Sequence, residues 1–318
     1  MNVTFNRERR AFMAAVDGKG EFAFHTQLRP HEVEGEITQE RALAMFHQAV
    51  GAPIPAEILS KGTWIAGYAL VAERFRRGRV FIAGDAAHLF TPAGGLGYNT
   101  AIEDAVNLGW KLAATVRGDG GPTLLSSYEA ERQPNAIRNT AYARQFAESL
   151  GSFVPVPEIE QETSAGTEAR CLAGSYLEAH GKAEFNIPGI TFGARYYTSP
   201  ITISDRTEPP PDAANLYTPS ACPGGRAPHL WLSPQQSLYD VFGFEWTLLR
   251  LSDRTGRRLA AAAGDLGLDI KIVDLLSDEA RDLYRRDLVL IRPDQIVAWR
   301  GKSDESATEI LRRVLGRE

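Results

Sequence analysis

The sequence predicts a mixed α/β protein, and three observations lead to this prediction. Near the N-terminus, "EFAFHTQLRP" alternates apolar Phe22 and Phe24 with polar neighbours, the two-residue period of a half-buried strand. In the middle of the chain, apolar residues recur at helical spacing over two long stretches. The last part predicts a strand, a helix, a strand, a hairpin and a helix, which is the order of a small α/β module.

Composition is that of an ordinary soluble globular protein, with 43% hydrophobic and 24% charged residues in a chain of 318. The net charge of −5 gives no electrostatic reason to expect nucleic acid or an anionic membrane as a partner. The sequence contains neither a long uncharged apolar run nor a signal-peptide core at its N-terminus. Its two distant cysteines, Cys171 and Cys222, predict no disulfide framework and no metal site. A cytoplasmic location fits these features best.

The first half of the chain predicts one short helix and several strands. "TQERALAMFHQAVG" has Thr38 as N-cap and Gly51 as stop. Short strand-like pieces follow in "TWIAGYALVAERF" and "RGRVFIAGD", and the second predicts a buried strand that ends at Gly84 and Asp85.

Two long helices follow these strands. The first has helically spaced apolar residues that we expect to face the core, at Ile102, Ala105, Gly109, Leu112, Ala113 and Val116. Thr100 is its predicted cap, and Gly118 ends it. The second, over about Leu124–Leu150, is expected to break or shift near Pro134.

The composition changes over residues 151–223, where "VPVPEIEQETSAG" and "TEPPPDAAN" predict a long linker. Beyond it the predicted elements are, in order, a strand at Trp246–Leu251, a helix at Arg257–Leu266, strands at Ile270–Asp274, Leu288–Ile291 and Ile296–Trp299, and a helix at about Ser306–Leu315. We therefore divide the chain into domains at 1–150 and 224–318 with the linker 151–223 between them.

The stretch "GDAAHLFTPAGGLGYNT" predicts a ligand site. A carboxylate such as Asp85 accepts hydrogen bonds from hydroxyl groups, including those of a sugar or ribityl chain. The loop Gly94-Gly95-Leu96-Gly97 has little side-chain bulk, so its N–H groups can touch a flat or anionic ligand. A following helix adds its positive end, which suits a reduced isoalloxazine ring.

Two other interpretations of this stretch remain open on spacing alone. "GLGYNT" partly matches the dinucleotide fingerprint G-x-G-x-x-G, but the last glycine is missing and no second strand ending in an acid follows. The stretch can also be an ordinary turn and glycine loop, with His88 as a satisfied polar residue.

A longer segment, "RVFIAGDAAHLFTPAGGLGYNTAIEDAVNLGWKLA", resembles the second FAD-binding motif of class A flavoprotein aromatic hydroxylases. These are FAD- and NAD(P)H-dependent monooxygenases of the phenol hydroxylase and p-hydroxybenzoate hydroxylase type. The resemblance continues in "LLSSYEAERQPNAIRNTAYAR", "YYTSPI" and "PGGRAPHLWL". It implies a thioredoxin-like C-terminal domain, here without a CxxC and therefore without disulfide chemistry.

The resemblance also implies roles for single residues. Asp85 would bond the ribityl hydroxyls or lie next to the pyrophosphate, and Pro92 would pack beside the flavin. Backbone donors would come from the Gly94–Gly97 loop, mainly Gly95, Leu96 and Gly97, with Tyr98 and Asn99 flanking the ring. Phe24, Gln27 and Trp64 are candidates for the substrate side, with plain sheet core or surface as an equal alternative. No residue is assigned as catalytic, because the flavin carries the hard chemistry.

The resemblance further implies an incomplete FAD-binding domain of Rossmann type. The family begins with a G-x-G-x-x-G turn and an acid that binds ribose, and this sequence contains neither. We expect a substrate-binding sheet followed by flavin-site helices, in a major fragment of a monooxygenase.

The activity that this family carries out is aromatic hydroxylation with NAD(P)H and O₂. A flavin C4a-hydroperoxide transfers its distal oxygen to a phenolic or polyketide-like ring. A non-catalytic remnant that serves as a binding or dimerisation module is the alternative, and a homodimer is left open. A halogenase is a third option, but no halogenase-type lysine or tryptophan motif is evident.

Overall fold

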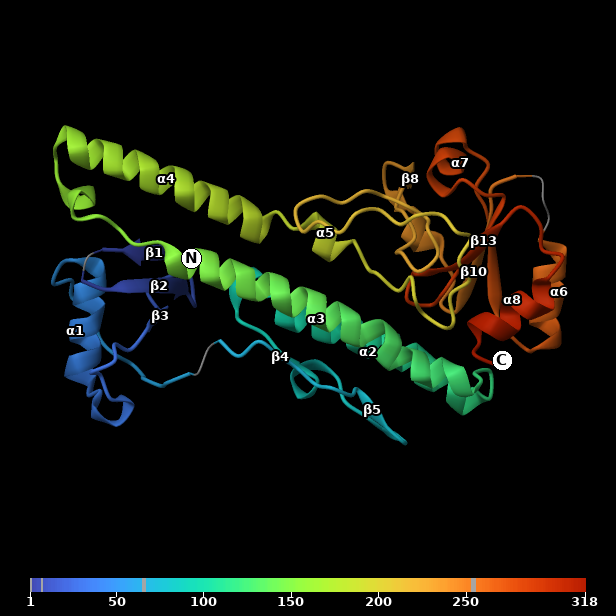
Figure 1. Ribbon diagram of the computed structural model, residues 1–318, viewed down its shortest axis with the longest axis horizontal. Coiled ribbons are helices and arrows are strands. Elements are labelled where there is room, and N and C mark those ends of the chain that lie inside the picture. Colours follow the sequence, from blue (N-terminus) through green and yellow to red (C-terminus); the bar gives the residue numbers. More distant parts are fainter. Residues whose placement is uncertain (1, 7, 65–66, 253–255) are drawn as a thin grey trace. The chain divides into compact units, whose positions relative to one another are not determined.

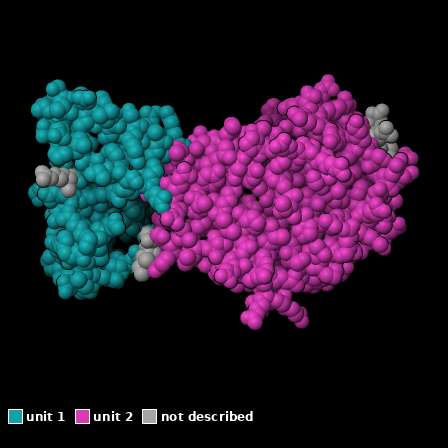
Figure 2. Space-filling model, viewed as in Figure 1, with its two compact units in different colours: residues 1–66, 148–182 teal, residues 67–147, 183–318 magenta. Residues whose placement is uncertain are grey.

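The computed structural model describes residues 2–6, 8–64, 67–252 and 256–318. They form two compact units, coloured separately in Figure 2. Unit 1 joins residues 1–66 to 148–182, and unit 2 joins residues 67–147 to 183–318. The predicted domain boundaries at 150 and 223 stay a prediction, because each unit combines segments that are far apart in sequence. None of the helices in the described part of the chain has the length and apolar character that a membrane crossing needs.

Unit 1 contains a three-stranded antiparallel sheet in the order β1-β2-β3 (Figure 1). Its strands are β1 (Asn2–Phe5), β2 (Arg10–Ala15) and β3 (Phe22–Thr26). After the turn η1 (Glu34–Glu36), helix α1 (Gln39–Val50) follows, with Thr38 as N-cap and Gly51 in the left-handed conformation at its C-cap. The strand around Phe24 and the ends of α1 are therefore confirmed.

The first part of unit 2 consists of two long helices and two short ribbons. Helix α2 (Leu96–Arg117) ends at Gly118, and α3 (Pro122–Ser152) continues through Pro134. The ribbons pair β4 (Leu70–Val71) with β7 (His88–Leu89) and β5 (Arg76–Arg77) with β6 (Val80–Phe81). The predicted break at Pro134 is wrong. One lost hydrogen bond does not end this helix, because buried contacts of Glu131 with Lys111 and of Asn139 with Thr100 hold it on the two sides of the proline.

The region predicted as a linker contains more structure than expected. It includes η4 (Pro157–Glu160), the 22-residue helix α4 (Ser164–Phe185) and the single turn α5 (Pro188–Thr191). Residues 193–223 have no regular helix or strand, as the proline-rich composition predicts. The sequence signal for α4 is weak, since few of its apolar residues face a core.

The C-terminal part of unit 2 is a four-stranded sheet in the order β11-β10-β12-β13. Strand β10 (Trp246–Arg250) is parallel to β11 (Ile270–Asp274) and antiparallel to β12 (Leu288–Ile291), which pairs with β13 (Val297–Gly301). This order and these directions are those of a thioredoxin-like fold, as predicted. The small elements β8 (Trp231–Ser233), β9 (Gln236–Ser237) and η5 (Leu238–Val241) precede it.

Both faces of this sheet are covered, which explains why its strands are almost continuously apolar. Leu248 and Leu290 pack on one face with α6 (Arg257–Asp265) and α8 (Ala307–Val314). Leu249 and Val289 pack on the other with α7 (Asp278–Tyr284), a helix that was not predicted from the sequence.

Candidate flavin loop

Residues 84–95, which include the short strand β7, lead into the N-terminus of α2, and together with its first turn, residues 96–99, we call them the loop 84–99. The turn η2 (Gly84–Ala86) carries Asp85, whose side chain is exposed. The turn η3 (Ala93–Gly95) comes directly before α2. Gly94 and Gly95 take the left-handed conformation there, with φ of 71° and 62°, which residues with a Cβ rarely adopt. Apart from the Gly94 N–H, which donates to Glu184 Oε1 at 2.9 Å, the loop therefore presents its backbone with little side-chain cover.

The two sides of the glycine loop differ. A Cβ built on Gly94 would lie 3.2 Å from Cδ2 of Phe146, whereas one on Gly95 would have no neighbour within 4 Å. One side of the loop thus packs against the protein, and the other faces open space. A flat ligand can approach the backbone from that open side.

Thr100 does not cap α2, contrary to the prediction. The helix begins earlier, at Leu96, with Gly95 as N-cap and without a side-chain cap. Thr100 is buried inside the helix, where its Oγ1 accepts a hydrogen bond from Nδ2 of Asn139 at 3.1 Å. The first amide groups of α2 have no intrahelical acceptor. They are available to a ligand at the positive end of the helix.

Asp85 does not follow a buried strand, contrary to the prediction. The strand β6 before it has two residues, and Val80 is 68% exposed. Phe81 and Ile82 of this run are half-buried, and in the described part of the chain β6 pairs with β5 alone. No described residue forms a hydrogen bond or ion pair with the Asp85 carboxylate, so both of its oxygens can accept hydrogen bonds from a ligand.

A buried carboxylate on α2 holds the Asp85 turn in place. Asp104 Oδ2 accepts hydrogen bonds from the Gly84 N–H at 3.1 Å and from His88 Nε2 at 2.6 Å. Its Oδ1 accepts one from Arg132 Nε at 2.7 Å. Burial by itself would raise the pKa of Asp104, but the His88 hydrogen bond and the Arg132 charge outweigh it and keep the pKa below its ordinary value. We call Gly84, His88, Asp104 and Arg132, together with Tyr196, which hydrogen-bonds to Arg132, the Asp104 cluster.

Arg132 connects this cluster to other parts of unit 2. Its Nη1 donates to the Tyr196 hydroxyl at 2.7 Å, and its Nη2 donates to the Thr100 carbonyl at 3.2 Å. The side chain is fully buried, so its charge needs partners of this kind. The turn that carries Asp85 is therefore anchored by charge-assisted hydrogen bonds.

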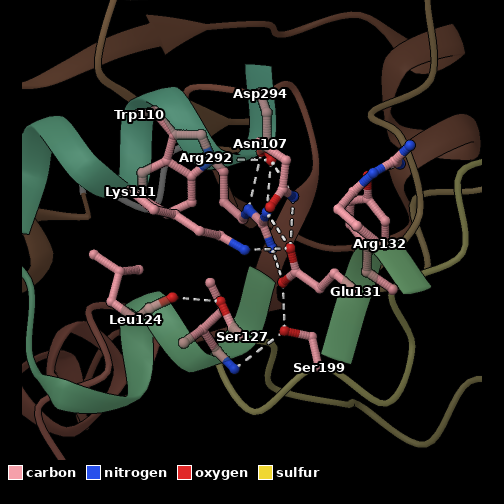
Figure 3. Close-up of polar contacts among 12 residues, drawn as sticks. Asn107, Trp110, Lys111, Leu124, Ser127, Glu131, Arg132, Ser199, Arg292 and Asp294 are labelled. Atoms are coloured by element: carbon pink, nitrogen blue, oxygen red, sulfur yellow. Dashed lines mark hydrogen bonds and ion pairs between the residues drawn. The ribbon is translucent and has the colours of Figure 1, made fainter. Parts of the chain in front are cut away.

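A second buried cluster lies further along α2 and is drawn in Figure 3. Glu131 of α3 accepts from Lys111 Nζ at 2.6 Å and from Arg292 Nη1 and Nη2 at 2.6 and 2.9 Å. It also binds the Asn107 amide at 2.7 Å and the Ser199 hydroxyl at 2.5 Å. We call these five residues, together with Asp294, the Glu131 cluster.

The charges of the Glu131 cluster balance. Arg292 Nη2 also contacts Asp294 Oδ2 at 2.6 Å, which places two cations beside two carboxylates. Burial alone would raise the pKa of Glu131, but Arg292 and Lys111 hold it well below its ordinary value. Through Arg292 and Asp294, the C-terminal sheet is joined to the helix that begins at the candidate flavin loop.

Neither cluster was predicted from the sequence, whose apolar spacing predicted that the opposite face of α2 is buried. Ile102, Leu112 and Val116 are exposed. The buried positions of the helix are mostly polar, namely Thr100, Asp104, Asn107 and Lys111. These polar residues recur at helical spacing. Their spacing would have predicted a buried polar face of α2 if polar residues had been considered for the core.

His88 is packed and hydrogen-bonded, as expected, and is 2% exposed. Asn99 Nδ2 donates to the Gly95 carbonyl at 2.8 Å, whereas the Tyr98 side chain is 77% exposed. Among the residues that the structure describes, no group of His, Cys, Asp and Glu is arranged to hold a metal ion.

The three candidates for the substrate side belong to unit 1. Phe24 packs edge-to-face on Phe46 with ring centroids 5.5 Å apart, and Gln27 and Trp64 are exposed. Their role in substrate binding stays a prediction.

Comparison with known protein families assigns both ends of the chain. Residues 3–143 match the FAD-binding domain family, and residues 220–318 match the C-terminal domain of aromatic-ring hydroxylases. The chain is 32% identical to the FAD-dependent monooxygenase apdD of Emericella nidulans, over 95% of this chain and 52% of that protein.

Solved structures agree with this assignment. RebC, soaked with chromopyrrolic acid and holding 7-carboxy-K252c, matches with a TM-score of 0.84 and 35% identity, over 96% of this chain and 57% of RebC. A ternary complex of aklavinone-11 hydroxylase with FAD and aklavinone matches with a TM-score of 0.77 and 28% identity, over 98% and 58% of the two chains. The chain thus spans between half and two thirds of the length of these proteins.

Proposed function

The chain belongs to the FAD-dependent aromatic-ring hydroxylase family, and from that premise we propose that it is the flavin-ring part of an aromatic monooxygenase. The reaction is hydroxylation of a phenolic or polyketide-like substrate with NAD(P)H and O₂. The observation that carries the proposal is the loop 84–99, with its free Asp85 carboxylate, its bare glycine backbone and the uncapped N-terminus of α2.

The residues of this loop suit an isoalloxazine ring and its ribityl chain. Asp85 accepts hydrogen bonds from ribityl hydroxyls. The amides of Leu96 and Gly97 would donate to the pyrimidine end, where the positive helix end stabilises negative charge, with Gly95, whose N–H donates to the Pro92 carbonyl at 3.2 Å, beside them. Pro92 and Gly94 would shape the loop beside the ring, and Tyr98 and Asn99 would flank it. When bound, FAD accepts electrons from NAD(P)H and activates O₂.

The aromatic substrate is a small molecule in this proposal, and Phe24, Gln27 and Trp64 are its candidate contacts. An apolar surrounding excludes water from the reacting ring, which prevents unproductive consumption of the reductant. We place the chain in the cytoplasm, where NAD(P)H is available. The proposal leaves open whether the chain forms a homodimer, and sedimentation of the purified chain tests this.

Turnover with isotopically labelled oxygen tests the proposed activity. The purified chain, supplied with FAD, NAD(P)H, ¹⁸O₂ and a series of phenols, should oxidise NAD(P)H faster when a productive phenol is present. One ¹⁸O atom should appear in the hydroxylated product by mass spectrometry. A chain that binds FAD yet gives no labelled product with any phenol would instead support the alternative of a non-catalytic binding module.

A further inference from the structure

A pocket in unit 2 lies apart from the residues assigned to the flavin loop. It is a half-open hollow whose empty space is about 380 Å³ when the open solvent at its mouth is included. The side chains that define its chemistry are Phe192, Arg195, Tyr197, Asp212, Tyr217 and Arg226. Arg226 belongs to "PGGRAPHLWL", a segment singled out in the sequence to which the proposed function assigns no role. We call this space the Arg226 pocket.

The backbone around the pocket is held firmly. The N–H of Gly224 donates to the Val297 carbonyl at 2.8 Å, and the Val297 N–H donates to the Gly225 carbonyl at 3.0 Å. Across the pocket, the Gly189 N–H donates to the Ala214 carbonyl at 2.9 Å. A Cβ on Gly189 would lie 1.7 Å from the Ala213 carbonyl oxygen, so this close approach requires glycine. The walls are therefore arranged before any ligand arrives.

Arg226 gives the pocket an unpaired positive charge. Its guanidinium lies over the rings of Phe192 and Tyr239, at 5.5 and 4.9 Å from their centroids. Its hydrogen bond to Oε1 of Gln295 is long, at 3.4 Å. No carboxylate among the described residues forms an ion pair with it. Stacking thus fixes the orientation of the guanidinium and leaves N–H groups free for an anion.

The acid in the pocket does not cancel this charge. Asp212 already accepts from Nε of Arg138 at 3.0 Å and from Nη2 of Arg138 at 2.8 Å. Arg195 lies 3.9 Å from the same carboxylate and donates to the Pro210 carbonyl. With Arg138 pairing Asp212, the lining keeps an excess of positive charge.

Two tyrosine hydroxyls add neutral donors. In the parts of the chain that the structure describes, neither the Tyr197 nor the Tyr217 hydroxyl has a hydrogen-bond partner. Burial raises the pKa of Tyr217 to about 12, so this hydroxyl keeps its proton at neutral pH. The rings of both residues, with Phe192, give the pocket apolar walls.

We propose that the Arg226 pocket is a binding site for a small aromatic carboxylate. The guanidinium edge matches the two oxygens of a carboxylate, a geometry that a neutral ligand cannot use. The phenolic hydroxyls donate to the same group, and the aromatic walls contact the ring of the ligand. An inorganic anion has no ring and would make no contact with these aromatic walls. No residue of the loop 84–99 lines the pocket, although Leu96 packs in the same core cluster as Ile190 and Ala214, next to the lining residues Gly189 and Ala213.

Benzoate is the probe that tests this proposal. Isothermal titration calorimetry of the purified chain should show saturable benzoate binding, and the neutral analogue benzamide should bind about tenfold more weakly or worse. Arg226→Gln should weaken benzoate binding by about tenfold or more, because a charge-assisted hydrogen bond is lost. Arg312→Gln, an exposed arginine on α8, serves as the matched control and should leave binding unchanged.

Further measurements test whether the Arg226 pocket acts separately from the flavin loop. They also test whether a loss of benzoate binding is caused by a folding defect. Asp85→Asn should leave benzoate binding unchanged, even if the proposed flavin site fails. Thermal unfolding of Arg226→Gln should match that of the unmodified chain, and Tyr217→Phe offers a milder second variant that should weaken benzoate binding. Absence of saturable benzoate binding, equal affinity for benzamide or inorganic phosphate, or unchanged affinity in Arg226→Gln and Tyr217→Phe would each overturn the proposal.

Discussion

At the scale of single residues, the interior of unit 2 depends on ionised side chains that balance one another. Glu131 and Arg132 are neighbours on α3, and each is the centre of one buried cluster. Neither is tolerable alone in the interior, because an unpaired buried charge costs several kcal/mol. The main effect of these buried ion pairs is therefore to restrict how the helices and the sheet can be arranged. Their net contribution to stability is smaller.

Removing one partner of Glu131 should be costly. We expect Arg292→Met to lower the free energy of unfolding by about 3–5 kcal/mol, because Glu131 then loses a bidentate cation while remaining buried. Urea unfolding followed by circular dichroism measures this, with the exposed Arg312→Met as the matched control. A loss below about 1 kcal/mol, the typical value for an exposed ion pair, would contradict the buried geometry.

The pH dependence of stability should report the ionisation of the Glu131 carboxylate. The pKa of Glu131 is lower in the folded chain than its ordinary value of 4.5, so its contribution is fully present above pH 4.5 and is lost as the pH falls below that value. We expect the difference in unfolding free energy between the unmodified chain and Glu131→Gln to be largest near neutral pH and to shrink below 4.5. A difference that is constant from neutral to acidic pH would show that Glu131 is not held ionised.

At the scale of elements, α2 is reversed with respect to an ordinary amphipathic helix. Several of its apolar residues, such as Val106, are exposed, and most of its buried residues, such as Asn107, are polar. The period of apolar residues correctly predicted a helix that ends at Gly118, but it could not show which face is covered. That depends on Glu131, Arg132 and Arg292, which are distant in sequence.

Two neighbouring substitutions on α2 test this reversal. We expect Val106→Ser to change the free energy of unfolding by no more than about 0.5 kcal/mol, because Val106 is 50% exposed. Asn107→Ala should cost about 1–3 kcal/mol, because it removes the amide that donates to buried Glu131. Chemical denaturation of both variants under the same conditions compares them. A larger loss of unfolding free energy for Val106→Ser than for Asn107→Ala would instead show that the apolar face of α2 packs in the core.

At the scale of the whole molecule, local signals predicted what local sequence determines. The C-terminal strands were predicted because Leu288–Ile291 and its neighbours are buried on both faces and therefore uniformly apolar. The loop 84–99 was predicted from its glycines and Asp85. Helix α4 and the burial of polar residues on α2 were not, because they depend on contacts between distant segments. The resemblance to a family assigned the cofactor class, which spacing alone left open.

Equilibrium titration of the purified chain with FAD tests the central claim, that the loop 84–99 holds a flavin. Quenching of flavin fluorescence should saturate for the unmodified chain and for Asp265→Asn, an exposed acid outside the loop. Asp85→Asn should bind FAD about tenfold more weakly or worse, since it loses a charged acceptor of hydrogen bonds, and should keep its circular dichroism spectrum. No saturable quenching by the unmodified chain, or equal affinity in Asp85→Asn, would contradict the claim.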